Sequence, residues 1–218
     1  MRKLLLLRPE PGLSASAERA RALGLEVTCC PLFRIEPLDW DAPNPGQFDG
    51  LLLTSANALR CAGPQLERFK SLPAHVVGQS TAAAAQKEGL RVETIGSGNV
   101  SDLLKRLPSR VRLLHLAGED HRPIENCEIE RRVTYRSAAI AEAGLPPLAG
   151  LVVAVHSPRA AKRLSELAGE RGTVIVAAIS EAAASAAGAG WEEVAVAAEP
   201  SDKSLLALAA SLCHKSDQ

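Results

Sequence analysis

Short apolar runs alternate along the whole chain with longer stretches of helical pattern. The stretches predict helices at residues 16–23, 56–69, 81–88, 101–107, 159–168, 181–187 and 203–212. The apolar runs predict strands at residues 3–7, 26–30, 50–53, 75–77, 92–95, 111–116, 132–136, 151–155, 173–177 and 194–197. These runs are nearly continuous in Leu, Val and Ile, which is typical of parallel strands covered on both faces. Strands that alternate with helices indicate an α/β fold with right-handed connections.

An internal repeat divides this pattern into two similar parts. The segment at residues 52–58 resembles the segment at residues 154–160, and the elements that follow keep the same spacing. The same difference in residue number relates Ser55 to Ser157, Gly78 to Ser180 and Leu103 to Leu205. A repeat of this length indicates a duplicated domain rather than a solenoid.

The duplicated parts do not follow one another end to end. The strand at 3–7 precedes the first repeat, and we expect it to pair with strands of the second, because the first repeat already gains the strands at 111–116 and 132–136. We therefore predict a discontinuous α/β lobe of residues 1–34 plus 140–218 and an inserted α/β lobe of residues 39–131. Two extended linker strands, 35–38 and 132–139, would join them. The connection between residues 120 and 131 is too short for an ordinary crossover helix.

Composition narrows the function classes. The 218 residues carry 25 basic and 25 acidic side chains, and this neutral balance disfavours non-specific nucleic-acid binding. Aromatic residues are only 3%, so base-stacking platforms are not expected. The five cysteines include no C-x-x-C pair, which indicates reduced thiols rather than a disulfide framework or a zinc site. No apolar run approaches the roughly 20 residues that span a bilayer, and we expect a cytoplasmic protein with no membrane partner.

Small polar residues follow several predicted strands at the point where a helix begins. Ligands of open α/β sheets bind at such carboxyl ends, and free N–H groups at helix N-termini favour anions. The same residues are also good helix N-caps, so both interpretations stay open. The candidate ligand-binding residues are Thr54, Ser55, Gly78, Gln79, Ser80, Thr81, Ser157 and Ser180, together with Arg8 at the end of the first strand.

Two further features have alternative interpretations. Tyr135 is the only tyrosine and lies on a predicted crossing strand, where it either packs the hinge or donates a proton. The turn from Gly96 to Gly98 half-matches a dinucleotide fingerprint, but Ser101 stands where the third glycine belongs. A plain turn with Ser101 as helix N-cap is the favoured interpretation there.

Several short segments stand out by their order and spacing along the chain rather than one by one. These are Leu6-Leu7-Arg8-Pro9, Leu53-Thr54-Ser55-Ala56-Asn57-Ala58, Val77-Gly78-Gln79-Ser80-Thr81-Ala82, Leu116-Ala117-Gly118-Glu119-Asp120-His121-Arg122, Val133-Thr134-Tyr135-Arg136, His156-Ser157-Pro158 and Ala178-Ile179-Ser180. Through these segments the chain resembles the uroporphyrinogen-III synthase family over nearly its whole length.

The resemblance implies a fold, a reaction and site residues. It implies two flavodoxin-like lobes joined by a two-stranded linker, one lobe being discontinuous. It implies an enzyme that cyclises hydroxymethylbilane with inversion of ring D and loss of water to give uroporphyrinogen III, with no metal or organic cofactor. Tyr135 matches the family's proposed proton donor and Thr81 a threonine near the cleft. Ser55, Gly78 and Ser157 match cleft-lining positions. Two departures are Glu181, an acid beside a predicted carboxylate site, and the short segment after Arg122.

Two other function classes remain as alternatives at this level. One is a two-lobed cytoplasmic binding protein for a small anionic ligand, and the other is a nucleotide-dependent enzyme that uses the turn at Gly96. For the synthase we expect a monomer whose linear tetrapyrrole substrate is handed over transiently by the preceding enzyme of its pathway.

Overall fold

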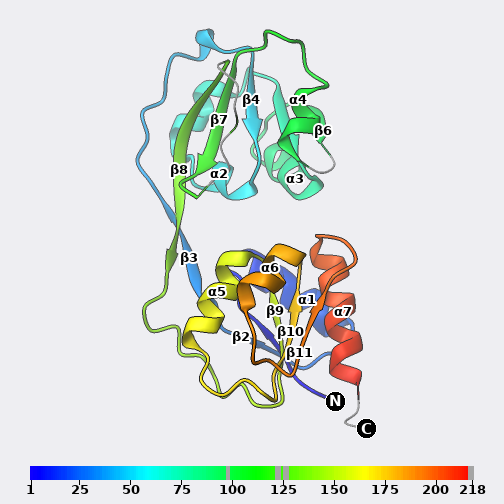
Figure 1. Cartoon of the computed structure of the whole chain (residues 1–218). Helices are drawn as coiled ribbons and strands as arrows, with labels where there is room; N and C mark the ends of the chain where they lie inside the picture. Colours follow the sequence, from blue (N-terminus) through cyan, green and yellow to red (C-terminus); the bar gives the residue numbers. More distant parts are fainter. Residues whose placement is uncertain (97–98, 121–123, 125–127, 216–218) are drawn as a thin grey trace. The chain divides into compact units, whose positions relative to one another are not determined.

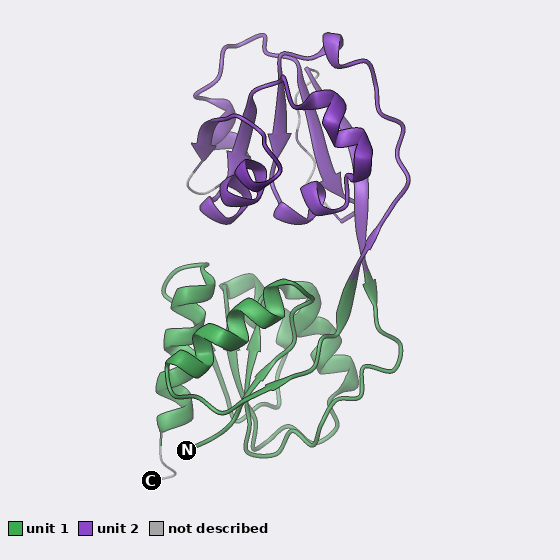
Figure 2. Cartoon of the chain, turned by 180° about the vertical axis from the view of Figure 1, so that it is seen from behind, with its two compact units in different colours: residues 1–34, 138–218 green, residues 35–137 purple. Residues whose placement is uncertain are grey.

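A computed structural model of the chain describes residues 1–96, 99–120, 124 and 128–215. Two compact units make up the molecule (Figure 2): residues 1–34 with 138–218 form the first, and residues 35–137 form the second. The first unit is therefore discontinuous in sequence, and the chain passes between the units twice. In the part of the chain that the structure describes, no helix is long and apolar enough to cross a membrane.

The first unit contains a five-stranded parallel sheet (Figure 1). Its strands lie in the order β11 (Glu193–Val196), β10 (Ile175–Ala178), β9 (Val152–Val155), β1 (Leu4–Leu6) and β2 (Val27–Cys29). The register pairs Leu4 of β1 with Val152 of β9 and with Val27 of β2. The prediction that the N-terminal strand joins strands of the second repeat is confirmed.

Four helices cover the two faces of this sheet. Side chains on one face pack with α5 (Pro158–Leu167) and α6 (Glu181–Ala187). Those on the other face pack with α1 (Gly12–Ala22) and α7 (Asp202–His214). Successive residues of a strand point to opposite faces, so Leu5 belongs to the first core and Leu4 and Leu6 to the second. This double burial explains why the strands have continuous apolar sequences.

The second unit contains a six-stranded sheet. The strand order is β3 (Phe33–Pro37), β8 (Ile129–Ala139), β7 (Leu113–Gly118), β4 (Gly50–Leu53), β5 (Ala74–Val77) and β6 (Val92–Gly96). The pairs from β8 to β6 are parallel. Hydrogen bonds from Leu38 N to Thr134 O and from Ile140 N to Leu32 O show that β3 runs antiparallel to β8. The predicted α/β class is confirmed in both units, and the predicted linker strands are extended; their action as a linker stays a prediction.

Short helices cover this second sheet. The helices α2 (Ala56–Arg60) and α3 (Gln79–Lys87) and the 3₁₀ helix η2 (Gly63–Phe69) pack on the face that includes Leu51 and Leu53. On the face that includes Leu52, α4 (Val100–Leu104) packs through Leu103. A second 3₁₀ helix, η1 (Pro45–Gln47), precedes β4.

Two connections in this unit bear on the predictions. The expected single helix at 56–69 is wrong, because Gly63 adopts φ +66° and Pro64 follows it, so the chain forms α2 and then η2. Of the residues described between β7 and β8, none is helical, as expected for so short a connection. His121 and Arg122 in this segment, and Gly98 of the glycine turn, lie outside the described residues. The expected N-cap at Ser101 is wrong, because Ser101 lies inside α4 and the side chain of Asn99 caps that helix.

Candidate functional site

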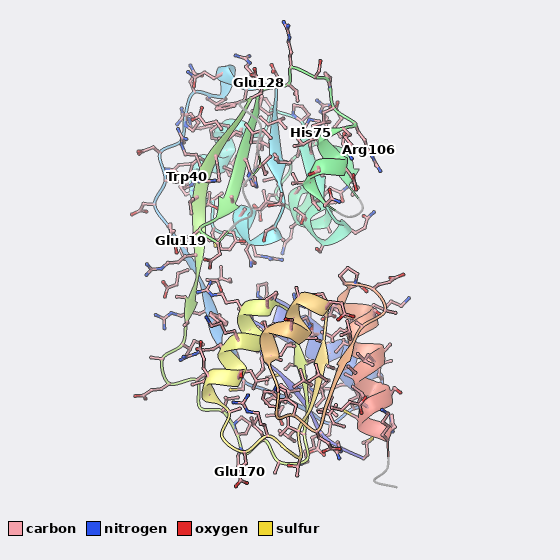
Figure 3. The ribbon with its side chains drawn as sticks, viewed as in Figure 1. Trp40, His75, Arg106, Glu119, Glu128 and Glu170 are labelled. Carbon is pink, nitrogen blue, oxygen red and sulfur yellow. The ribbon has the colours of Figure 1, made fainter. Side chains whose placement is uncertain are left out.

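The carboxyl ends of the parallel strands bring the predicted site residues of each unit to one edge of its sheet. In the second unit the register places Leu53 of β4 beside Val76 of β5 and Leu116 of β7. Thr54, Gly78 and Gly118 therefore lie at the same edge of the sheet, at the carboxyl ends of three neighbouring strands. Figure 3 labels Glu119 at this edge, after β7, and Glu128 at the opposite edge, where β8 begins. In the first unit, Arg8, Ser157 and Ser180 follow β1, β9 and β10 in the same way.

Three of the predicted serines cap helices. The hydroxyl of Ser55 accepts a hydrogen bond from the backbone N of Asn57 at 3.2 Å. Ser157 accepts one from Ala160 N at 3.1 Å and Ser180 one from Ala183 N at 3.4 Å. The N-cap interpretation is therefore correct for all three. A capping hydroxyl keeps its own proton, so each serine can still donate a hydrogen bond to an anion.

The start of α3 combines an obligatory glycine with exposed polar residues. Gly78 adopts φ +85°, a conformation that other residues rarely take, and precedes the first turn of the helix. Gln79 and Ser80 are exposed beside it. Thr81 differs from its neighbours, because only 3% of its surface is exposed. The structure thus leaves Gln79 and Ser80 exposed at the edge beside Gly78 and buries Thr81.

A buried histidine holds the exposed threonine at the end of β4. Thr54 Oγ1 lies 3.1 Å from Nε2 of His115, which is 3% exposed on β7. The pair depends on the register that sets Leu52 beside His115. Sequence reasoning did not connect the two residues, because a histidine inside an apolar strand gives no sign of which neighbouring strand it faces.

Tyr135 lies at the same edge, on β8. Its ring is half-buried and packs against the core beneath α2 and α3. The tip of the ring lies over Gly118, the last residue of β7. Within the described ranges no hydrogen bond engages the Tyr135 hydroxyl, so the group is available to a ligand at this edge.

The sequence interpretation of Arg8 as a cation facing substrate alone is incomplete. Its Nη1 donates to Asp202 Oδ1 and to Ser16 Oγ, each at 3.0 Å, and 29% of the side chain is exposed. The guanidinium lies against Gly12, where a Cβ would come within 2.6 Å of Arg8 Nε. Arg8 therefore has a fixed position, with Nε and Nη2 left over from these two bonds.

Asp202 is the centre of the cluster that fixes Arg8. It stands in the first turn of α7 and also accepts hydrogen bonds from Ser16 Oγ at 2.6 Å, from Arg19 Nε at 2.8 Å and from His156 Nε2 at 2.7 Å. The donors come from α1 and from the end of β9. The cluster therefore ties α1, α7 and two strand ends together at the carboxyl edge.

The charge states in this cluster follow from burial and hydrogen bonding. Burial raises the pKa of Asp202, but hydrogen bonds from His156, Ser16 and Arg19 outweigh it and hold that pKa well below its ordinary value. Burial lowers the pKa of His156 in spite of its bond to Asp202. At neutral pH the carboxylate is ionised, and the neutral imidazole donates through Nε2. Two guanidinium groups then face one carboxylate, so the cluster keeps a positive charge that suits an anionic ligand.

Sequence reasoning missed Ser16, Arg19, His156 and Asp202 as members of one cluster. A signal was present, because Arg8 and His156 follow two strands that were expected in one parallel sheet. Two basic groups at one edge imply an acidic partner, yet nothing in the sequence singled out Asp202 from other acids at helix starts. Within residues 1–96, 99–120, 124 and 128–215, no group of three or more His, Cys, Asp or Glu could hold a metal ion.

Comparisons with known proteins agree on one family. A family model described as uroporphyrinogen-III synthase HemD matches residues 14–207. The crystal structure of uroporphyrinogen-III synthetase from Helicobacter pylori is similar, with a TM-score of 0.69 and 17% identity, over 97% of this chain and 100% of that one. A mutant uroporphyrinogen III synthase from Thermus thermophilus is similar with a TM-score of 0.54 and 18% identity, over 97% and 99% of the two chains. At these identities the solved structures show a shared fold.

Proposed function

The chain belongs to the uroporphyrinogen-III synthase family, and we propose that its two carboxyl edges carry out the reaction of that family. The reaction is the cyclisation of hydroxymethylbilane with inversion of ring D and loss of water, and it needs no cofactor. The observation that carries this conclusion is the family match over residues 14–207, supported by the fold shared with the Helicobacter pylori structure. The alternative of a two-lobed binding protein has no support among these matches.

Substrate binding is assigned to both edges because the linear tetrapyrrole carries eight carboxylates. Free backbone N–H groups in the first turns of helices, with nearby hydroxyls, hold carboxylates well. The proposed binding residues are Thr54, Ser55, Gly78, Gln79, Ser80, Thr81, Ser157, Ser180 and Arg8. Thr81 would act through its backbone N–H, since its side chain is buried.

The edge at α6 is the weakest part of this assignment. Glu181 stands in the first turn of the helix, directly after Ser180. A carboxylate there stabilises the helix dipole itself and repels a substrate carboxylate. The contact at Ser180 is therefore expected to contribute least to affinity.

Tyr135 is assigned the role of proton donor. A proton from its hydroxyl to the leaving hydroxyl of the substrate lets that group depart as water. The nitrogen of the same pyrrole ring stabilises the cation that remains, and the phenolate regains a proton later in the cycle. Positioned acids of this kind contribute about 10²–10⁴-fold to rate. The enzyme's larger task is to fold the substrate so that closure with inversion outruns the unassisted closure without it.

Product analysis tests this function. Hydroxymethylbilane generated enzymatically is supplied to the purified chain, and the uroporphyrin isomers are separated after oxidation. We expect the type III isomer to dominate. A product mixture containing only the type I isomer, as forms without enzyme, would exclude the synthase reaction.

Assembly and hand-over are part of the same proposal. We take the chain to act as a monomer and to receive its unstable substrate from the preceding enzyme of the pathway by transient contact. Sedimentation velocity at increasing concentration tests the first point, and competition by a trapping reagent for free substrate tests the second. The cytoplasmic location expected from the sequence stays a prediction.

A further inference from the structure

The ladder between β7 and β8 changes register directly before Tyr135. Up to Ala117 the strands pair residue by residue, with Ala117 beside Val133, but Gly118 then pairs with Tyr135. One additional residue, Thr134, is thus accommodated in β8. Such a shift re-aims the side chains that follow it, since side chains alternate between the faces of a sheet.

Thr134 is held in place from both sides. It is fully buried, and its Oγ1 donates to the carbonyl of Ala58 in α2 at 3.2 Å and lies 3.5 Å from the carbonyl of Ala117. Its own carbonyl accepts a hydrogen bond from Leu38 N at 2.9 Å. Because a buried hydroxyl without a partner is costly, the bond to Ala58 holds the Thr134 side chain on the sheet face that α2 covers.

Gly118 makes room for the tyrosine ring. A Cβ built on Gly118 would lie 2.7 Å from Cζ of Tyr135, 2.9 Å from its Oη and 3.0 Å from its Cε2. Gly118 does not have a positive φ, so its backbone would accept another residue. A side chain at residue 118 is excluded because the end of the Tyr135 ring occupies the space that its Cβ would need. Beyond this contact, Glu119 N donates to Tyr135 O at 2.9 Å and fixes the backbone of Tyr135.

We infer that Thr134 and Gly118 are positioning residues for the Tyr135 hydroxyl. Thr134 sets the register that turns the ring toward β7, and Gly118 lets the ring lie flat against the end of that strand. The hydroxyl is thereby held at the carboxyl edge. Without the register shift, Thr134 would pair with Gly118, and Tyr135 would stand one position further along and project from the other face. The inference rests on the proposed role of Tyr135 as proton donor.

The test compares four single variants with a control. Gly118→Ala places a methyl group where the ring lies, and Thr134→Val removes the hydroxyl bond at nearly constant shape. Thr134→Ser keeps that bond, and Tyr135→Phe removes the acid. The control is Gly172→Ala, which adds a methyl group in open space at a glycine without a positive φ. Turnover and KM are measured below the unfolding temperature of every variant.

The expected pattern is a loss of kcat with little change of KM. Tyr135→Phe is expected to lower kcat about 10²-fold, and Gly118→Ala and Thr134→Val about tenfold or more, because small misplacements of a catalytic group are costly. Thr134→Ser and Gly172→Ala should retain the wild-type kcat. In the Tyr135→Phe background, Gly118→Ala should lower kcat less than about twofold further, since the group it displaces is already absent.

A spectroscopic measurement separates positioning from general damage. Tyr135 is the only tyrosine, so selectively labelled protein gives the ring signals of this residue alone in a carbon–proton NMR spectrum. These signals should shift in Gly118→Ala and Thr134→Val and stay in place in Gly172→Ala.

Three results would overturn the inference. The first is that the ring signals of Tyr135 do not shift in Gly118→Ala and Thr134→Val. The second is that both variants keep a kcat within twofold of wild type although Tyr135→Phe is slow. Equal losses in the wild-type and Tyr135→Phe backgrounds would show a structural role only. An unchanged kcat in Tyr135→Phe itself would instead contradict the role of the acid, on which the inference depends.

Discussion

Asp202 joins four side chains at the carboxyl edge of the first unit. It accepts hydrogen bonds from Arg8, Ser16, Arg19 and His156, and its side chain is 18% exposed. Removing an acceptor from such a network leaves several partly buried donors unsatisfied, which costs more than the loss of any one bond.

The Asp202→Ala substitution is expected to lower the free energy of unfolding by about 2–4 kcal/mol. Urea unfolding followed by circular dichroism measures this change. The control is Asp102→Ala, which removes an acid from the first turn of α4 where the side chain is 50% exposed. Equal and small effects of the two substitutions would contradict a central role for Asp202.

The stability of the chain should fall as the pH is lowered from 7 to 5. The pKa of His156 is lowered by burial, as is that of His75, so the unfolded chain binds protons that the folded chain excludes. The stability that the two neutral histidines contribute is fully present when the pH is above the ordinary histidine pKa of about 6.5, and it is lost as the pH falls below that value. Asp202, whose pKa is also lowered, adds a further loss below about pH 4.

The histidine contribution can be measured from urea midpoints at each pH. The His156→Gln variant cannot titrate at this position, so its stability should depend less on pH between 7 and 5 than that of the wild type. Parallel curves for the two proteins would contradict the assignment to His156.

The proposed role of Arg8 in substrate binding is separable from its role in the Asp202 cluster. Arg8→Gln and Arg19→Gln each remove one partner of Asp202, but only Arg8 is assigned to substrate. Arg8→Gln is expected to raise KM about tenfold, the loss of one charge-assisted contact of about 1.4 kcal/mol, and Arg19→Gln less than twofold. A similar KM in both variants would assign Arg8 to the scaffold alone.

At the scale of elements, the central strands were predictable because each buries both faces. Leu4 to Leu7 read as one apolar run, since alternate residues enter two different cores. The N-caps at Ser55, Ser157 and Ser180 were likewise visible as small hydroxyl residues after apolar runs. The break between α2 and η2 was missed, because the apolar spacing continues through Gly63 although the backbone does not.

The capping role of Ser157 predicts a measurable cost. Ser157→Ala is expected to lower the free energy of unfolding by about 1 kcal/mol, the usual value of an N-cap. Asn99→Ala removes the cap of α4, where Asn99 accepts from Asp102 N at 2.9 Å, and should cost a similar amount. Ser157 is also assigned to substrate, so KM should rise in Ser157→Ala and not in Asn99→Ala. Equal KM values would restrict Ser157 to capping.

At the scale of the whole molecule, the sequence predicted the topology better than the site. The repeat and the unpaired N-terminal strand sufficed to place β1 in the sheet of the second repeat, where it pairs with β9. The pair of Thr54 with His115 and the contact of Tyr135 with Gly118 depend on which residues stand side by side in neighbouring strands, and the Asp202 cluster depends on how α1 and α7 pack over the ends of β1 and β9. Hydrophobic pattern does not specify register to the single residue, and the shift at Thr134 has no signal in it at all.

The proposed function assigns tetrapyrrole binding to residues at the carboxyl edge of the sheet in each unit. Hydrogen exchange with and without uroporphyrinogen III, read by mass spectrometry, measures this directly. We predict slower exchange in the bound protein at residues 54–58, 78–82 and 157–161, and unchanged exchange at the opposite edge of each sheet, near residues 89–91 and 148–151. Protection confined to one unit, or found at the opposite edges, would contradict the claim.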